Sequence, residues 1–331
     1  MTRRPACATP RFAHIGELCD TASMRVIRTL VSSVLDYAGL YPPASLDEPT
    51  VVSNYAALHG SHRSWMLGRL VWPAARLDRL SELAVGAAPV AEPPETEGAW
   101  PVTALLGDAG TPEFARTVEL VRAFNERHEQ AGAPAMRVDS VELKVTGAAA
   151  VDGALDALPD DVWPYVEIPL DADPRGLIAA ISGLEAAAKF RTGGTTAAAH
   201  PSAAALAEAI ASCAHAGVAF KATAGLHRAM RHWNAAASAN QFGFLSLFVG
   251  ACLLHSRKID AEGLQAMLED ADPSNFDISD NAIAWQGARI VTREIEEARE
   301  RFAHSFGSCS FDEPWDDLTA LELLPAAGQA S

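Results

Sequence analysis

The sequence predicts an α/β protein, a closed (β/α)8 barrel of the TIM type with a helical extension at its N-terminus. From about residue 70, short apolar segments alternate with helical stretches, a rhythm typical of βα units in a parallel sheet. A chain of 331 residues with 49% hydrophobic side chains suits one barrel with a large core. We therefore expect residues 1–64 to form a helical extension packed on a barrel of residues 65–331.

The elements follow in order along the chain. Residues 15–37 carry apolar side chains at helical spacing until Gly39 and two prolines, so a helix is expected there. Helices are also expected between the strands, each beginning near Pro or Ser and ending before Gly. The eighth strand has two candidates, residues 275–279 and 308–311. The other seven predicted strands are residues 70–72, 102–106, 140–145, 165–170, 188–192, 219–223 and 243–248.

Bulk properties exclude several classes of function. A net charge of −16 argues against nucleic acid as a partner, because phosphate backbones bind basic surfaces. The longest apolar run, residues 242–254, is about 13 residues long against the roughly 20 needed to cross a bilayer, so no membrane span is expected. The cysteines form no C-x-x-C pair and no ligand cluster, which favours a reducing cytoplasm and no metal. We also expect no cofactor.

Lysine is rare in this chain, and its placement is informative. Of the 26 basic residues only four are lysines, and three of them fall within predicted strands. An unpaired ammonium is costly in the wall of a parallel barrel. Side chains alternate along a strand, so the apolar residues meet the helices and the charged residues between them point inward. Six charged groups are thereby expected to converge in the barrel interior: Glu142, Lys144, Glu167, Lys189, Arg191 and Lys221.

This convergence suggests chemistry. A lysine that is desolvated or close to other cations loses affinity for its proton, and it can then be a neutral amine near pH 7. Such an amine attacks carbonyl carbons and forms a Schiff base. Lys189 and Lys221 lie one βα unit apart, so they are expected to be neighbours in the barrel wall. The structural alternative is a buried salt-bridge network that only fills the barrel.

The two lysine segments, KFRTGG from Lys189 and KATAGLH from Lys221, resemble class I aldolases of the deoxyribose-phosphate aldolase type. The resemblance covers about residues 187–227 and implies that Lys189 is the Schiff-base nucleophile and Lys221 tunes its pKa. Where that family has a phosphate cradle of glycine and serine, this chain has the apolar residues 242–254. The chain is otherwise similar to an uncharacterised bacterial barrel family, which implies a fold and no reaction.

Further candidates for substrate binding lie at the strand ends. Glycines in βα turns let backbone amides approach an anion, although ordinary turn glycines would have the same pattern. His227 follows a strand end and is a candidate acid or base. Cys309 is either a nucleophile with a lowered pKa or a buried inert thiol. The expected substrate-binding residues are Lys144, Arg191, Thr192, Gly193, Thr223, Gly225, His227 and Cys309.

The leading functional hypothesis is a lyase or aldolase-like enzyme acting on a small anionic carbonyl compound through a lysine imine. Lys189 or Lys221 would form the imine, and Glu142 or Glu167 would move protons. One alternative is a non-covalent acid/base isomerase or decarboxylase that uses the same pocket. The other is a non-catalytic barrel that binds a ligand or serves in assembly. The small substrate is the only partner expected, and homo-oligomerisation is left open.

Overall fold

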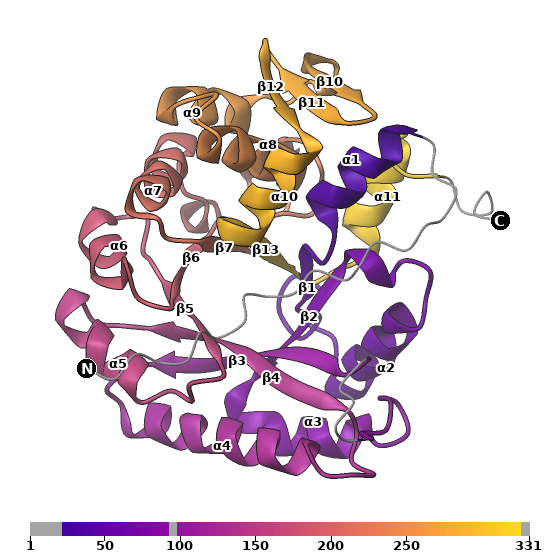
Figure 1. Ribbon diagram of the computed structural model, residues 1–331, viewed down its shortest axis with the longest axis vertical. Coiled ribbons are helices and arrows are strands. Elements are labelled where there is room, and N and C mark those ends of the chain that lie inside the picture. Colours follow the sequence, from indigo (N-terminus) through magenta and orange to yellow (C-terminus); the bar gives the residue numbers. More distant parts are fainter. Residues whose placement is uncertain (1–21, 93–97, 326–331) are drawn as a thin grey trace.

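The computed structural model of the chain describes residues 22–92 and 98–325 (Figure 1). Eight parallel strands close into a barrel in the order β1-β13-β7-β6-β5-β4-β3-β2. The predicted (β/α)8 fold is therefore confirmed. The barrel strands are β1 (Leu35–Tyr37), β2 (Leu67–Pro73), β3 (Trp100–Asp108), β4 (Met136–Lys144), β5 (Trp163–Glu167), β6 (Ala187–Arg191), β7 (Phe220–Thr223) and β13 (Ala303–Ser308).

Helices surround this barrel and bury their apolar faces against it (Figure 1). Local sequence sets their ends: the Thr111 hydroxyl accepts from the amide of Phe114 at the start of one helix, and Gly217, with φ of 65°, ends another. The helices are α1 (Ala22–Val31), α2 (Glu48–His59), α3 (Leu77–Ala84), α4 (Pro112–His128), α5 (Val151–Asp156), α6 (Arg175–Ile181), α7 (Ala203–Ala216), α8 (Phe244–His255), α9 (Ala261–Glu269), α10 (Thr292–Arg301) and α11 (Asp312–Ala320).

The N-terminal segment differs from its prediction. The expected helix over residues 15–37 ends at Val31, and its first residues lie outside the described part of the chain. Ser33 has a φ of 48°, which breaks the helix, and β1 then pairs with both β13 and β2. All three residues of β1 are buried. Apart from Asp36, the sequence is apolar there and shows no regular alternation of apolar and polar side chains, so the strand could not be told from a continuation of the preceding helix. The barrel thus begins before residue 64, and the boundary drawn there is wrong.

Two other strand assignments are also corrected. Residues 243–248 are the N-cap and the first residues of α8, since a fully buried apolar run has no period that separates helix from strand. Residues 275–279 contribute to β10 (Phe276–Ser279), which pairs with β11 (Ala282–Trp285) and β12 (Ala288–Val291) in a small antiparallel sheet outside the barrel. The eighth barrel strand is β13, which ends where the second candidate, 308–311, begins.

The loop between β7 and α8 carries a hairpin, β8 (His232–Asn234) with β9 (Ala239–Gln241). Short 3-10 turns lie at Ser64–Met66, Ala74–Arg76, Ala148–Ala150, Ala197–Ala199 and Pro273–Asn275. In the part of the chain that is described, none of the helices has the length and apolarity that a bilayer crossing requires.

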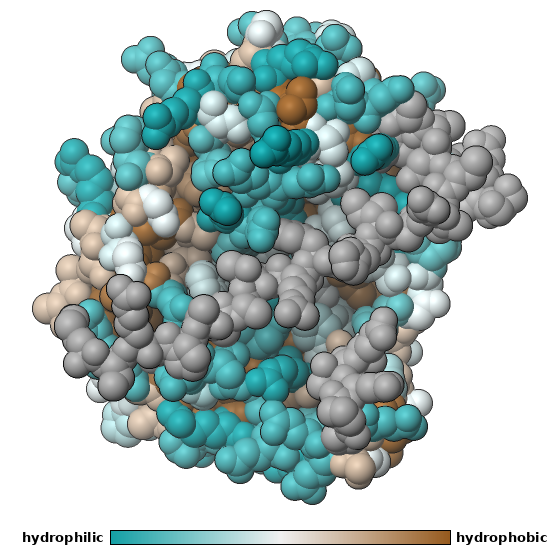
Figure 2. Space-filling view, viewed as in Figure 1, coloured by the Kyte–Doolittle hydropathy of each residue, from teal (hydrophilic) through white to brown (hydrophobic). Residues whose placement is uncertain are grey.

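The outer surface is mostly polar. Figure 2 shows a face covered largely by hydrophilic side chains, with hydrophobic ones small in extent and scattered, in keeping with the net charge of −16. Among the described residues, the large hydrophobic side chains that are exposed are Val85, Val90, Leu184 and Trp233. Homo-oligomerisation therefore stays a prediction without a surface assigned to it.

Candidate functional site

The register of three adjacent strands places ionisable side chains side by side. Glu167 on β5 is the Cα partner of Lys189 on β6, and Lys189 is the partner of Lys221 on β7. Their sequence neighbours, such as Ala188 and Ala222, belong to the apolar core that the strands share with the helices. Since side chains alternate along a strand, the three ionisable groups point to the opposite side, into the barrel.

Inside the barrel, lysines and carboxylates alternate in one continuous series. The Lys189 Nζ atom lies 2.6 Å from Glu142 Oε2 and 2.9 Å from Glu167 Oε2. The Lys221 Nζ atom lies 2.9 Å from Glu142 Oε1 and 2.6 Å from Asp36 Oδ2. Lys144 reaches Glu167 at 3.5 Å. We name this series the lysine–carboxylate chain: Asp36, Lys221, Glu142, Lys189, Glu167 and Lys144.

Exposure rises along the lysine–carboxylate chain. The side chains of Asp36 and Lys221 are 0% exposed, those of Glu142 and Lys189 are 6% and 11% exposed, and Lys144 reaches 57%. The lysine–carboxylate chain therefore runs from the closed interior of the barrel to the solvent-facing ends of the strands. Lys189 is the deeper of the two lysines in this series whose side chains keep some exposure, whereas the Lys221 side chain is fully enclosed.

The opposite charges in the lysine–carboxylate chain stabilise one another's ionised forms. Burial alone would raise the pKa of Glu142, but the Lys189 and Lys221 ammonium groups outweigh burial and lower it to about 2. Burial likewise opposes the charge of Lys189, yet Glu142 and Glu167 outweigh that effect and raise its pKa. Asp36 and Glu142 similarly raise the pKa of Lys221 against the effect of burial. In the resting protein both lysines are ammonium groups near neutral pH.

This corrects the expectation of a neutral amine. That expectation placed Lys189 and Lys221 next to each other as two cations, and in strand register they are indeed partners. Their amines, however, each contact Glu142, which lies between them and neutralises the repulsion. An amine flanked by carboxylates keeps its proton, because opposite charges within a few ångströms favour the ionised form.

Several members of this interior site were not anticipated from the sequence. Asp36 accepts hydrogen bonds from the Ser305 hydroxyl at 2.8 Å and from the Arg69 amide at 2.9 Å, in addition to its contact with Lys221. The Tyr165 ring lies under the Lys221 amine, 5.0 Å from it. A lone acid in the apolar run VLDY was the available signal for Asp36, and it was missed because that run was read as helix.

The remaining binding candidates lie near the turns that follow β6 and β7. The Arg191 side chain is exposed, and its Nε donates to the carbonyl of Gly193 at 3.0 Å. The Thr192 hydroxyl donates to the carbonyl of Ala224 at 2.6 Å, which ties the two turns together, and Thr223 is half-buried. A role for these residues and for the exposed Lys144 in binding an anion stays a prediction.

The two turn glycines have a packing role. A Cβ on Gly193 would lie 2.9 Å from the Cα atom of Gly225, so the two turns touch backbone to backbone. Gly225 also has a φ of 77°, which only glycine adopts without strain. The close approach of the turns accounts for both residues by itself.

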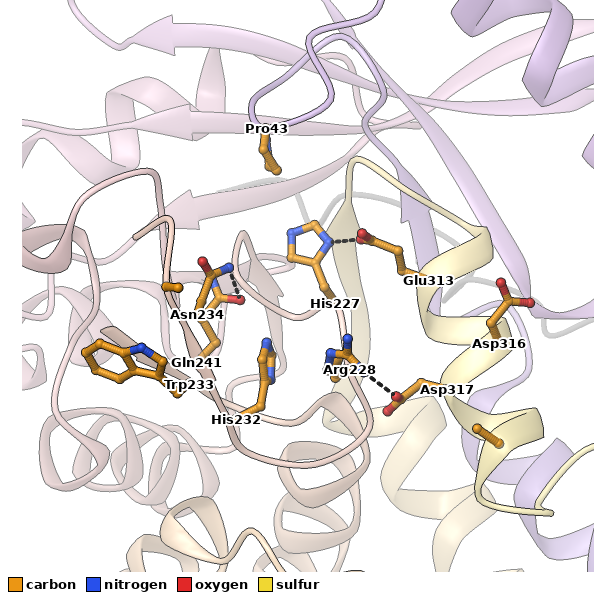
Figure 3. A pocket seen from close by; sticks show the side chains of 12 residues that line it. Pro43, His227, Arg228, His232, Trp233, Asn234, Gln241, Glu313, Asp316 and Asp317 are labelled. Atoms are coloured by element: carbon orange, nitrogen blue, oxygen red, sulfur yellow. Dashed lines mark hydrogen bonds and ion pairs between the residues drawn. The ribbon is translucent and has the colours of Figure 1, made fainter. Parts of the chain in front are cut away.

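His227 and Cys309 lie in different places. His227 lines a pocket of about 550 Å³ at the strand ends, and its Nδ1 lies 2.7 Å from Glu313 Oε2 (Figure 3). Cys309 lines a separate pocket of about 330 Å³ beside Tyr37. Burial raises the pKa of the Cys309 thiol, which favours the inert thiol over the activated nucleophile, and a role of Cys309 in substrate binding stays a prediction.

No family model and no curated protein matches the chain. Among solved structures, a monomeric dihydrodipicolinate synthase variant aligns at 10% identity over 60% of this chain and 64% of its own, with a TM-score of 0.37. The chain thus spans less than two thirds of that protein's length. RipC from Yersinia pestis aligns at 11% identity over 62% of this chain and 90% of its own, with a TM-score of 0.30. These similarities are too low to bear on the reaction.

Proposed function

We propose that the protein is a lyase or aldolase-like enzyme that acts on a small anionic carbonyl compound through an imine on Lys189. One observation carries this proposal. The Lys189 amine lies between two carboxylates, at 2.6 Å from Glu142 and 2.9 Å from Glu167, and the Lys189 side chain is 11% exposed on a strand that ends two residues later, at Arg191. Barrel enzymes work at that end of their strands.

The raised pKa of Lys189 is compatible with imine formation, because the reaction conserves charge. An ammonium group and a carbonyl give an iminium ion and water, and the single positive charge remains on the same nitrogen. The two carboxylates that stabilise the ammonium at rest therefore also stabilise the iminium product. Their electrostatic contribution is not lost along the reaction.

The protons have short paths in this arrangement. Before attack, the Lys189 ammonium passes one proton to Glu142 or Glu167, each already within hydrogen-bond distance. The neutral amine then bonds to the carbonyl carbon, and one proton moves from the nitrogen to the former carbonyl oxygen. The protonated carboxyl returns its proton to the same oxygen, which leaves as water as the C=N bond of the iminium ion forms. Lys221 acts as a positioning residue, because its amine holds the other oxygen of Glu142 at 2.9 Å.

An anionic substituent on the substrate fits the exposed end of the site. Lys144 follows Glu167 in the lysine–carboxylate chain with 57% of its side chain exposed, and Arg191 is exposed at the end of β6. In the proposed enzyme, these two cations bind a carboxylate on a ligand whose carbonyl carbon bonds to Lys189.

The first prediction concerns covalent trapping of the imine on Lys189. Incubation with sodium borohydride and pyruvate, glycolaldehyde or dihydroxyacetone should reduce the imine to a stable secondary amine, and peptide mass spectrometry should locate the added mass on Lys189. Lys189→Arg should abolish the adduct, whereas Lys144→Arg, which keeps the exposed cation, should retain it. An absent adduct, or one confined to another lysine, would rule out the imine at Lys189.

A second candidate function has its own supporting observation. Because Glu142 and Glu167 raise the pKa of Lys189, the residue also suits a non-covalent acid/base isomerase or decarboxylase in which it stays an ammonium group. Lys189→Arg separates the two, since a guanidinium preserves a charge contact and cannot form an imine. The complete pairing of the lysine–carboxylate chain is equally what a non-catalytic barrel would need.

A further inference from the structure

The outermost ion pair of the lysine–carboxylate chain joins Lys144 to Glu167, and it differs from the pairs below it. Leu143 and Val166 are Cα partners, and Lys144 and Glu167 are the next and last residues of β4 and β5. Their charges are 3.5 Å apart, beyond the usual range of an N–H···O hydrogen bond. This pair is the longest and the most exposed of the series. Exposed pairs are weak, so another carboxylate competes for Lys144.

The two glutamates of the series are held in different ways. Both oxygens of Glu142 have a close ammonium partner, Oε2 at 2.6 Å from Lys189 and Oε1 at 2.9 Å from Lys221. Glu167 has a close contact at Oε2, 2.9 Å from Lys189, whereas its Oε1 faces Lys144. Protonation of Glu142 would also take a carboxylate from the enclosed Lys221, which breaks a second buried pair. Protonation of Glu167 disturbs the exposed contact with Lys144 instead, so Glu167 is the better proton acceptor for Lys189.

The charges near Glu167 come from the two strands beside β5. On β4 these are Glu142 and Lys144, and on β6 they are Lys189 and Arg191. Burial raises the pKa of Glu167, but Lys189 and Lys144 outweigh burial and lower it. The Arg191 guanidinium donates to a carbonyl of its own turn. Since Lys189 is the reacting group, Lys144 is the cation that can leave Glu167 without disturbing the reacting pair.

We propose that Lys144 makes proton transfer from Lys189 to Glu167 depend on a carboxylate of the ligand. The role of Lys189 as the reacting amine rests on the proposed function. Without a ligand, Lys144 contacts Glu167 and stabilises its ionised form. A ligand carboxylate binds the Lys144 ammonium and draws it away from Glu167 Oε1. Glu167 then loses one of its two cationic neighbours and accepts a proton more readily.

The transfer balances in atoms and in charge. An N–H bond of the Lys189 ammonium breaks, an O–H bond forms at Glu167 Oε2, and the products are a neutral amine and a neutral carboxyl. Lys189 and Lys144 contact the same carboxyl group, so the carbonyl and the carboxylate of the ligand are only a few bonds apart, as in an α-keto or β-keto acid. A ketone without a carboxylate leaves Lys144 on Glu167. The arrangement therefore selects keto acids over neutral ketones.

An equilibrium measurement tests this coupling without any imine. Oxamate has the shape of pyruvate, but its amide carbonyl forms no imine, and its carboxyl stays ionised at acidic pH. In the full chain with carbon-13-labelled glutamate, assigned with Glu167→Gln, oxamate should raise the midpoint of the Glu167 titration. Lys144→Met should raise that midpoint without oxamate and remove the response to it. Lys258→Met is the matched control, because Lys258 pairs with Glu294 at 3.3 Å outside the barrel wall, and it should behave as the wild type.

The rate of imine formation gives a second test, with effects of opposite sign. Pyruvate has a carboxylate where hydroxyacetone has a neutral hydroxymethyl group. At a cyanoborohydride concentration at which imine formation limits the rate, Lys144→Met should slow the labelling of Lys189 by pyruvate about tenfold, because the carboxylate loses a partner. With hydroxyacetone the same variant should be about two to five times faster than the wild type, because Glu167 no longer faces a second cation. A merely structural role of Lys144 would slow both reactions.

The outcomes distinguish this inference from the proposed function. A Glu167 midpoint that ignores both oxamate and the loss of Lys144 would overturn the coupling, whether or not an imine forms. Equal slowing of pyruvate and hydroxyacetone in Lys144→Met would overturn it as well. A midpoint that responds to oxamate, with no adduct from either ketone in the wild type, would refute the imine on Lys189 and support the coupling of Lys144 to Glu167 in a non-covalent reaction.

Discussion

Lys221 is enclosed completely in the barrel, and its surroundings explain how a charge is tolerated there. Its amine contacts carboxylates of Asp36 and Glu142 and lies 5.0 Å from the Tyr165 ring. Breaking a buried pair by removing one partner typically costs about 3–5 kcal/mol, because the other charge is left unpaired. Apolar side chains would fill the same space without the free-energy cost of burying charges. The retained charges are therefore the observation on single residues that most favours a function.

The Glu142 carboxyl should respond to pH in a way that an isolated glutamate does not. Its pKa is about 2 in the folded protein and 4.5 as an ordinary side chain. A lowered carboxyl pKa stabilises the fold above pH 4.5, and this contribution of about 3 kcal/mol is lost as the pH falls toward 2. Carbon-13 NMR of the labelled carboxyl, assigned with Glu142→Gln, should give a midpoint near 2. A midpoint near 4 would contradict the ion-paired geometry.

At the scale of elements, the site depends on how closely adjacent βα units approach. The turns after β6 and β7 touch at Gly193 and Gly225, and the Thr192 hydroxyl fastens one turn to the other. This contact fixes the ends of the two strands that carry Lys189 and Lys221. The same two turns precede the segments that hold His200 and His227, and His227 lines the pocket of about 550 Å³ at the strand ends.

Gly193→Ala should therefore destabilise the protein. The added Cβ would lie 2.9 Å from the Cα atom of Gly225, a backbone contact that cannot move aside easily, and we expect a cost of about 1–3 kcal/mol in the free energy of unfolding. Gly153→Ala is the control, because Gly153 lies exposed in α5 with open space around a Cβ. That variant should gain up to about 1 kcal/mol. Equal stability of Gly193→Ala and wild type in urea unfolding would disprove the turn contact.

At the scale of the whole molecule, closure of the barrel joins the two ends of the described chain. The short strand β1 pairs with β2 on one side and with β13 on the other, and it delivers Asp36 to the lysine–carboxylate chain. Without β1, the remaining strands would form an open sheet with two unpaired edges, and Lys221 would lose one of its carboxylate partners.

A fragment of residues 65–331 tests this requirement. Although it contains the other seven barrel strands, it lacks β1, and we expect it to aggregate or to unfold without cooperativity. The full chain, measured in parallel by circular dichroism and urea titration, should unfold in a cooperative transition. A soluble fragment with the same unfolding midpoint as the full chain would mean that β1 is dispensable.

Much of the fold and part of the site could be predicted from local patterns in the sequence. The recurrence of apolar segments and helices predicted the barrel, and the alternation of side chains along β6 and β7 predicted that Lys189 and Lys221 point inward. Both patterns depend on residues close in sequence. The pattern failed where burial is complete on all sides, as in β1 and α8, since uniform apolarity carries no period.

Tertiary structure decided which charges meet. The sequence by itself determined that lysines and glutamates share the barrel interior, but it did not place Glu142 between the two amines, bring Asp36 to Lys221 or pair His227 with Glu313. Those contacts join residues from different strands and loops, and they depend on strand register and barrel closure. The protonation state of each lysine follows from its nearest charges, so it too was fixed only when the barrel closed.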